Sequence, residues 1–174
     1  MSVPPIEMQD WFRNVFRPHF DEWVIEPINR LVVSRDALIG FIFMSCAIDY
    51  LAGFLWGKST VGKNRESYRL FIDEYFEKGK YDSDGLYDSL RNGLVHMFTI
   101  KNRKYTLIHN APGIHLKNDD AGQIVLNAGN FRDELIAAKN KYFDDVENNL
   151  DLMDKLVERL NRDGIMGPST SIIK

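Results

Sequence analysis

The sequence has little cysteine, no excess of positive charge and no low-complexity tract. Its single cysteine, Cys46, cannot form a disulfide within one chain, which excludes a disulfide-stapled miniprotein. The 22 basic and 25 acidic residues give a net charge of −3, so no global positive field attracts nucleic acid or anionic lipid. Any anion site must therefore be local. With 44% hydrophobic and 27% charged residues, the composition is typical of a globular protein and excludes a disordered or collagen-like chain.

The amino terminus also lacks the cationic start and apolar stretch of a secretory leader. Together with the lone cysteine, this absence predicts a cytoplasmic protein. One apolar stretch, Ala37 to Trp56, has about the length of a membrane span. Asp49 interrupts it, at a cost of about 2.5–3.5 kcal/mol at the centre of a bilayer. A helix buried on all sides, inside the domain or between two subunits, explains the same pattern, and we expect no membrane span.

The length of 174 residues leaves room for one domain only. We expect a single helical domain over residues 1–164 and a loose tail over 165–174. Apolar residues recur at helical spacing over most of the chain, which predicts a mainly α-helical bundle. Pro18 and Pro27 are expected to break the first 33 residues into short helices, because proline removes a helix donor. The last helix is expected to run unbroken from about residue 131 to 161.

The apolar periodicity changes from helical to alternating over residues 104–127. Three short segments, at 105–109, 114–117 and 123–126, are separated by clusters of turn-forming residues. This pattern predicts a small antiparallel β insertion just before the last long helix.

The stretch 87–98 carries the residues best suited to chemistry. On an ideal α-helix, Asn92 and His96 share a face, whereas Arg91 lies about 140° round from His96 and must swing toward it. Histidine can be acid or base near neutral pH, and arginine binds a phosphate through two hydrogen bonds. Gly93 has no side chain and would let another backbone approach beside the polar pair. These residue types suit cleavage of RNA through its own 2′-hydroxyl.

The sequence Arg91-Asn92-x-x-x-His96 resembles the Arg-polar-x(3)-His signature of the HEPN domains (higher eukaryotes and prokaryotes nucleotide-binding). The order of elements over about residues 34–98 is also similar, since Asp49 lies in a long apolar helix two helices before the motif. The resemblance implies a HEPN-like helical bundle, often dimeric, and a metal-independent ribonuclease of a toxin, defence or RNA-processing system. It implies neither a cofactor nor a metal. It implies that Arg91, Asn92 and His96 are the catalytic residues and that Asp49 and Asp88 support them.

In this interpretation Arg91 holds the scissile phosphate, His96 transfers protons and Asn92 orients them. One motif helix supplies a single histidine, so a homodimer with two facing motif helices would supply both acid and base. The substrate would be single-stranded RNA, and a toxin of this kind would have a cognate antitoxin as its partner. Five cations could follow the RNA backbone, namely Lys58, Lys63, Lys101, Arg103 and Lys104.

Two alternatives stay open at this point. The arginine and the histidine could serve packing in a non-catalytic binding or dimerisation module of the same fold. The cations at 101–104 could complement the dipole at the carboxyl end of the preceding helix. Asp49, the only charge in its apolar run, needs a donor in either case. We expect Arg91 or His96 to be this donor, with the Ser45 hydroxyl as the alternative.

Overall fold

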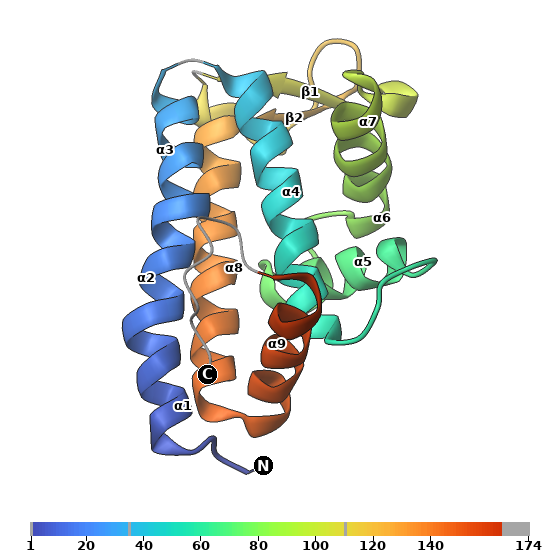
Figure 1. Ribbon diagram of the computed structural model, residues 1–174. Coiled ribbons are helices and arrows are strands. Elements are labelled where there is room, and N and C mark those ends of the chain that lie inside the picture. Colours follow the sequence, from blue (N-terminus) through green and yellow to red (C-terminus); the bar gives the residue numbers. More distant parts are fainter. Residues whose placement is uncertain (1, 35, 110, 165–174) are drawn as a thin grey trace.

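A computed structural model describes residues 2–34, 36–109 and 111–164, so the tail predicted over 165–174 lies outside the described residues. The described chain forms a helical bundle that carries a two-stranded sheet at one end (Figure 1). The α-helices are α1 (Ile6–Trp11), α2 (Arg17–Phe20), α3 (Glu26–Val33), α4 (Ala37–Trp56), α5 (Asn64–Tyr75), α6 (Ser83–Leu86), α7 (Val95–Met97), α8 (Ala128–Asn148) and α9 (Leu150–Asp163). The other elements are the π-helical segments η1 (Phe12–Phe16), η2 (Asp21–Ile25) and η3 (Tyr87–Leu94), the 3-10 turns η4 (Lys101–Arg103) and η5 (Pro112–Ile114), and the strands β1 (Tyr105–Ile108) and β2 (Ile124–Asn127).

Residues 6–33 form one continuous helical rod, so the breaks predicted at Pro18 and Pro27 are wrong. Each proline lies in the first turn of an α-helix that directly follows a π segment. A proline ring normally clashes with the carbonyl one turn earlier, and the wider π turn gives that carbonyl room. The rod can therefore continue past both residues. Its buried Phe16 and Phe20 pack against Phe143 of α8, with ring centroids 5.7 and 5.1 Å apart.

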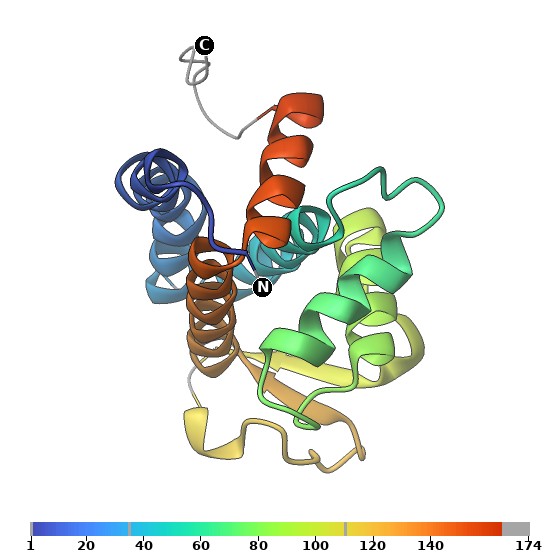
Figure 2. The same cartoon turned by 90° about the horizontal axis from the view of Figure 1, so that it is seen from below.

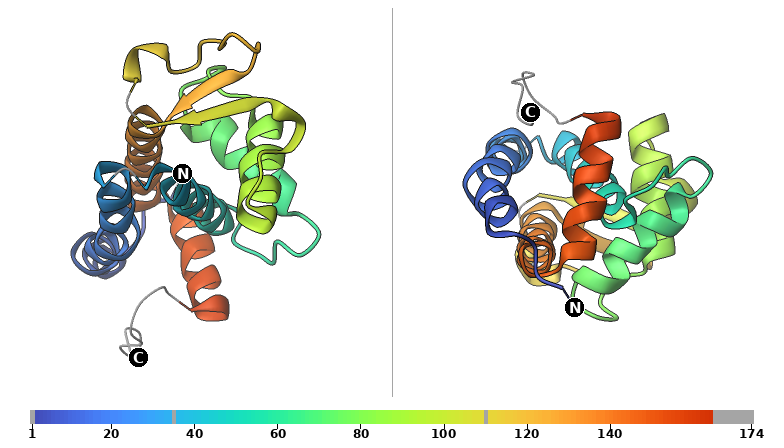
Figure 3. Two further views of the ribbon diagram at one scale, coloured as in Figure 1. Left: turned by 90° about the horizontal axis from the view of Figure 1, so that it is seen from above. Right: turned by 60° about the horizontal axis from the view of Figure 1, so that its bottom comes forward.

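Helix α4 is the central element of the bundle. It contacts α3, α5, α8, α9 and η3, and it runs between the amino-terminal rod on one side and the α6–η3–α7 helix on the other (Figure 3). By length and composition it could cross a membrane, but 61% of its apolar window is buried inside the protein. Burial on all sides is confirmed only in part. The amino-terminal half of α4 leaves Leu38, Ile39 and Phe43 exposed at 47%, 43% and 45%.

The last helix is interrupted at Asn149, so the prediction of one unbroken helix is wrong. Asn149 has extended backbone angles (φ −135°, ψ 110°), and its side-chain oxygen accepts a hydrogen bond of 3.1 Å from the Asp151 N–H. Asparagine is among the best residues for this capping role. The break lets α9 turn back beside α8 and pack on α4 (Figure 2). The buried residues of α9, Met153, Leu156 and Leu160, therefore close the bundle core from a second direction.

The two strands pair in parallel, so the prediction of an antiparallel insertion is wrong. The middle segment, 114–117, begins within η5 and contains Leu116 in the left-handed region (φ 62°), so it forms no strand of its own. It still bonds β2 from the outside, with Leu116 N–H donating to the Val125 carbonyl at 2.7 Å. Because the middle segment lies beyond β2 instead of between the strands, β2 pairs directly with β1. The chain reverses once into the middle segment and again into β2, so β1 and β2 run in the same direction and their pairing is parallel.

His115 fastens this insertion to the bundle. Its Nδ1 accepts a hydrogen bond of 3.0 Å from the Asn127 N–H, where β2 meets α8. Its Nε2 lies 2.9 Å from the hydroxyl of Tyr81. Since Nδ1 is an acceptor, the imidazole is neutral and Nε2–H donates to Tyr81. Burial, reinforced by the charge of Lys80, lowers the pKa of His115 below its usual 6.5, although the carboxylate of Glu134 opposes the shift.

Candidate functional site

Arg91 and Asn92 lie on the π-helical segment η3 instead of the expected α-helix, and His96 follows in α7. In η3 the hydrogen-bonding repeat lengthens from four residues to five, so side chains five apart come to face each other. This change brings Arg91 next to His96, which an ideal α-helix would have placed about 140° away. Single π turns occur frequently at functional sites, where they adjust the aim of one side chain. The five-residue repeat of η3 therefore brings Arg91 and His96 together. On an α-helix this contact would depend on the length of the arginine side chain alone.

Arg91 joins the motif helix to α4. Its Nη2 donates to Oδ2 of Asp49 at 3.2 Å, and its Nη1 is bonded to Nε2 of His96. The expected pairing of Asp49 with Arg91 is confirmed. The side chain of Arg91 is 18% exposed and that of Asp49 is 32% exposed, while His96 lies at the surface. The cluster is thus partly shielded from water on the bundle side and open toward solvent at the imidazole.

The contact between Arg91 and His96 occupies one nitrogen of the imidazole. A guanidinium has only donors, so Nε2 of His96 is the acceptor in this contact. The lone pair that a general base needs is therefore engaged by Arg91 in this structure. An anion that binds Arg91 would compete for the same N–H groups and release Nε2. Asp49, Arg91 and His96 together offer a charge clamp for a phosphate and a proton acceptor beside it.

Cys46 lies one helical turn before Asp49, on the same side of α4, and is exposed. Partial burial of its sulfur raises the pKa of the thiol, and the Asp49 carboxylate raises it further, while Arg91 opposes the shift. The thiol therefore stays protonated near neutral pH, and the electrostatics do not favour a thiolate nucleophile here.

Two of the predicted site residues have other surroundings. Asp88 pairs with Arg65 of α5, which also donates to Asp84 at 2.9 Å. Within the described residues, no hydrogen bond joins Asn92 to Arg91 or His96. The π turn explains the second result, because it faces His96 toward the residue five positions back in place of the residue four back.

Gly93 allows the close backbone approach that the sequence predicts, and the approaching segment is the loop that follows α7 in the same chain. A Cβ at this position would lie 2.5 Å from the Thr99 carbonyl oxygen and 3.0 Å from the Lys101 nitrogen. Ser89 also donates to the Lys101 carbonyl at 3.4 Å. The loop that carries η4 is therefore held against the motif helix, close to the cluster in the fold.

The five predicted backbone-binding cations fall into three groups. Lys63 pairs with Glu66 at 3.0 Å and Lys104 pairs with Asp82, so each already has a carboxylate partner. Lys58 lies over the Trp56 ring, 5.6 Å from its centroid. Among the described residues, Lys101 and Arg103 form no ion pair with a carboxylate. The cations most available to an anion therefore follow the motif helix directly.

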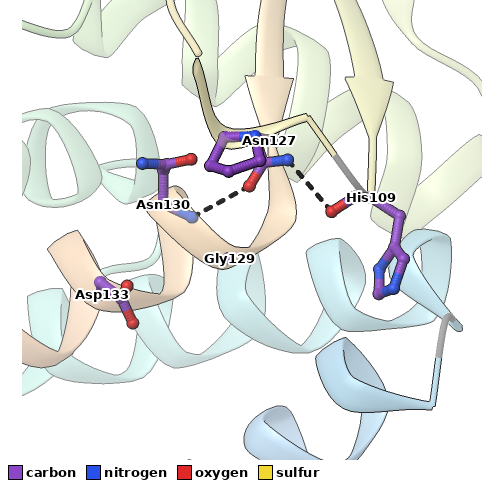
Figure 4. A pocket seen from close by; sticks show the side chains of 6 residues that line it. His109, Asn127, Gly129, Asn130 and Asp133 are labelled. Carbon is purple, nitrogen blue, oxygen red and sulfur yellow. Dashed lines mark hydrogen bonds between the residues drawn. The ribbon is translucent and has the colours of Figure 1, made fainter. Parts of the chain in front are cut away.

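A separate shallow pocket of about 320 Å³ opens where β2 leads into α8 (Figure 4). Its polar lining comes from His109, Asn127, Asn130 and Asp133, and Asn127 donates to the His109 carbonyl at 3.0 Å. None of its lining residues belongs to α4 or η3. In the described ranges, no group of three or more histidine, cysteine, aspartate or glutamate side chains has the geometry of a metal site.

Comparison of the chain with family models, with curated proteins and with solved structures finds no significant match.

Proposed function

We propose that this protein is a metal-independent endoribonuclease of the HEPN type that acts as a homodimer on single-stranded RNA. The observation that carries the proposal is the joining of Arg91 to both Asp49 and His96 at the carboxyl end of the motif helix. The motif supplies the residue types, and the π turn supplies their contact. The proposal includes a cytoplasmic location, a toxin or defence role and a cognate antitoxin as partner.

In the proposed reaction, Arg91 binds a non-bridging oxygen of the scissile phosphate and leaves His96. Nε2 of His96 then takes the proton of the 2′-hydroxyl, whose oxygen attacks phosphorus. The bond from phosphorus to the 5′-oxygen breaks, and that oxygen takes a proton from a second imidazole. The products are a 2′,3′-cyclic phosphate and a 5′-hydroxyl. Asp49 holds the guanidinium in place, which is a positioning role.

The second imidazole is the reason for proposing a homodimer, because the motif holds one histidine per chain. Apolar side chains exposed on the amino-terminal half of α4, namely Leu38, Ile39 and Phe43, support a second copy on this side of the bundle. A stable pair would bury at least about 1,000 Å² in total. Sedimentation equilibrium at micromolar concentration should therefore give the mass of two chains, and a monomer would remove the two-histidine mechanism.

The reaction itself is tested by incubating the protein with single-stranded RNA in EDTA and analysing the ends. We expect 2′,3′-cyclic phosphate or 3′-phosphate products and no cleavage of DNA, which lacks the attacking hydroxyl. His96→Ala should lower the rate by about 10²–10⁴-fold, and Arg91→Ala by a similar factor. His19→Ala and Arg30→Ala are matched controls outside the cluster and should keep full activity. Cleavage that persists in the doubly substituted cluster would show that a contaminant is responsible.

A second candidate is a non-catalytic binding or dimerisation module. It is favoured by the fact that Arg91 satisfies Asp49 and His96 within one chain, so the cluster needs no ligand to be complete. A wild-type protein that is folded and dimeric but leaves several RNAs intact in EDTA would select this candidate.

A further inference from the structure

Phe98 differs from most other phenylalanines of this chain in its exposure. Of eleven phenylalanines, only Phe43 and Phe98 are exposed, and Phe98 is the more exposed of the two at 72%. Its ring lies outside the hydrophobic core that the described residues form. An aromatic side chain of this size gains little from folding when most of its surface stays in water.

Phe98 is also held in an unfavourable backbone conformation. It ends α7 with φ 52° and ψ 30°, in the left-handed region that glycine normally occupies at the end of a helix. Two backbone hydrogen bonds fix this conformation: Phe98 N–H donates to the Leu94 carbonyl at 3.1 Å, and Thr99 N–H donates to the Gly93 carbonyl at 3.4 Å. For a bulky residue such a conformation is an outlier. Neither packing nor backbone preference explains an aromatic residue here, and strain of this kind clusters at functional sites.

The position of Phe98 relates it to the cluster. It lies two residues after His96, which places their Cα atoms within about 7.6 Å. Lys101 and Arg103 follow in η4, and the loop that connects Phe98 to η4 is packed on Gly93. A strand of RNA whose phosphate lies on Arg91 would therefore have an exposed aromatic ring and two cations within the next few residues of the chain. Stacking of a base on an aromatic side chain is a general way to hold single-stranded RNA.

We propose that Phe98 is a base-stacking residue that holds a nucleotide next to the scissile phosphate. The inference rests on the proposed ribonuclease function and adds the way in which the site selects single-stranded substrate. Because every base has a π-face, stacking at Phe98 predicts tolerance of base identity and rejection of paired strands. It assigns to Phe98 binding of the substrate and no part in proton transfer.

The test compares Phe98→Gly, Phe98→Leu and Phe98→Tyr with the wild type. Affinity is measured for a 2′-O-methyl oligonucleotide, which lacks the nucleophile and cannot be cleaved, and kcat and KM are measured with ordinary RNA. Phe98→Gly should weaken affinity about 5- to 100-fold, the range that corresponds to loss of one stacked base. It should raise KM by a similar factor and leave kcat nearly unchanged. Phe98→Tyr keeps the ring and should keep the affinity, whereas Phe98→Leu should behave as the glycine variant does.

Protein stability separates stacking from a structural role. Glycine fits the left-handed backbone better than phenylalanine, so Phe98→Gly should unfold at the same temperature as the wild type or higher. Equal affinity of all four proteins, or full affinity of Phe98→Leu, would overturn the proposal. Loss of the dimer in Phe98→Gly would assign the ring to a protein interface instead. If the wild type cleaves RNA and the Phe98 variants cleave and bind it equally well, the stacking role alone is refuted. If the wild type neither cleaves nor binds RNA, the proposed function is refuted as well.

Discussion

Gly93→Ala tests whether the loop after the motif helix is held by close backbone packing. The added Cβ would lie 2.5 Å from the Thr99 oxygen and 3.0 Å from the Lys101 nitrogen, and both atoms belong to the backbone. Neither can move aside as a flexible side chain would, so the loop must shift. Overpacking of this kind costs about 1–3 kcal/mol, against a gain of up to about 1 kcal/mol from the better helix propensity of alanine. The net loss in the free energy of unfolding should be about 1–2 kcal/mol.

For a chain of this length, that loss corresponds to a fall of about 2–8 °C in Tm, which circular dichroism measures directly. Gly113→Ala is the matched control, because a Cβ there meets no atom within 4 Å and its φ is not positive. The control should shift Tm by less than about 2 °C, as expected for a surface change within ±0.5 kcal/mol. If Gly93→Ala proved as stable as the wild type while the control behaved as expected, the packing of this loop on η3 would be refuted.

Three further predictions concern charged side chains. Asp49→Asn should change Tm by no more than about 2–4 °C, because partly exposed ion pairs contribute about 1 kcal/mol or less, yet it should slow RNA cleavage about 10- to 100-fold by releasing Arg91. In the wild type, stability should fall as the pH drops below about 6.5, because folding lowers the pKa of His115 and the unfolded chain binds the extra proton. His115→Asn keeps an acceptor for the Asn127 N–H and should flatten this part of a profile of Tm against pH. Lys139 is buried but pairs with the half-exposed Asp21, so Lys139→Met should be neutral or stabilising, whereas Asp21→Asn should lower the urea midpoint by leaving a buried cation unpaired.

The elements that the sequence predicted well are those with strong local signals. Helix α4 covers Ala37–Trp56, the apolar stretch that the sequence shows, and Gly57 caps it with φ 78°, which glycine reaches without strain. The helical periodicity that predicts a mainly α-helical bundle also holds in α5, where Tyr68, Phe71 and Ile72 are buried. In both cases, residues near in sequence determine the outcome, either through the 3.6-residue period or through one glycine. Elements of this kind form independently of the contacts that distant segments make.

The elements that sequence reasoning missed depend on contacts between distant segments. Over the eight residues 87–94, the apolar period of a π-helix differs too little from that of an α-helix for the sequence to distinguish them. Whether β2 pairs directly with β1 depends on which side of β2 the middle segment lies. The break at Asn149 is stabilised because α9 can then bury Met153, Leu156 and Leu160 against the bundle. Each outcome follows from tertiary packing that overrides a weak local preference.

The candidate site shows the same division at the level of single residues. The need of Asp49 for a partner was predictable, because a carboxylate in an apolar helix is costly without a donor. The partner was predicted to within two residues, Arg91 or His96, and the structure shows that it is Arg91. The contact of Arg91 with His96 was not predictable from the sequence, because it depends on the five-residue repeat of η3. An α-helical version of η3 would turn the guanidinium away from the imidazole and leave Asp49 to hold it alone. The proposed chemistry thus depends on a backbone feature, and a change that restores α-helical geometry in η3 should lower cleavage even where Arg91, Asp49 and His96 are all retained.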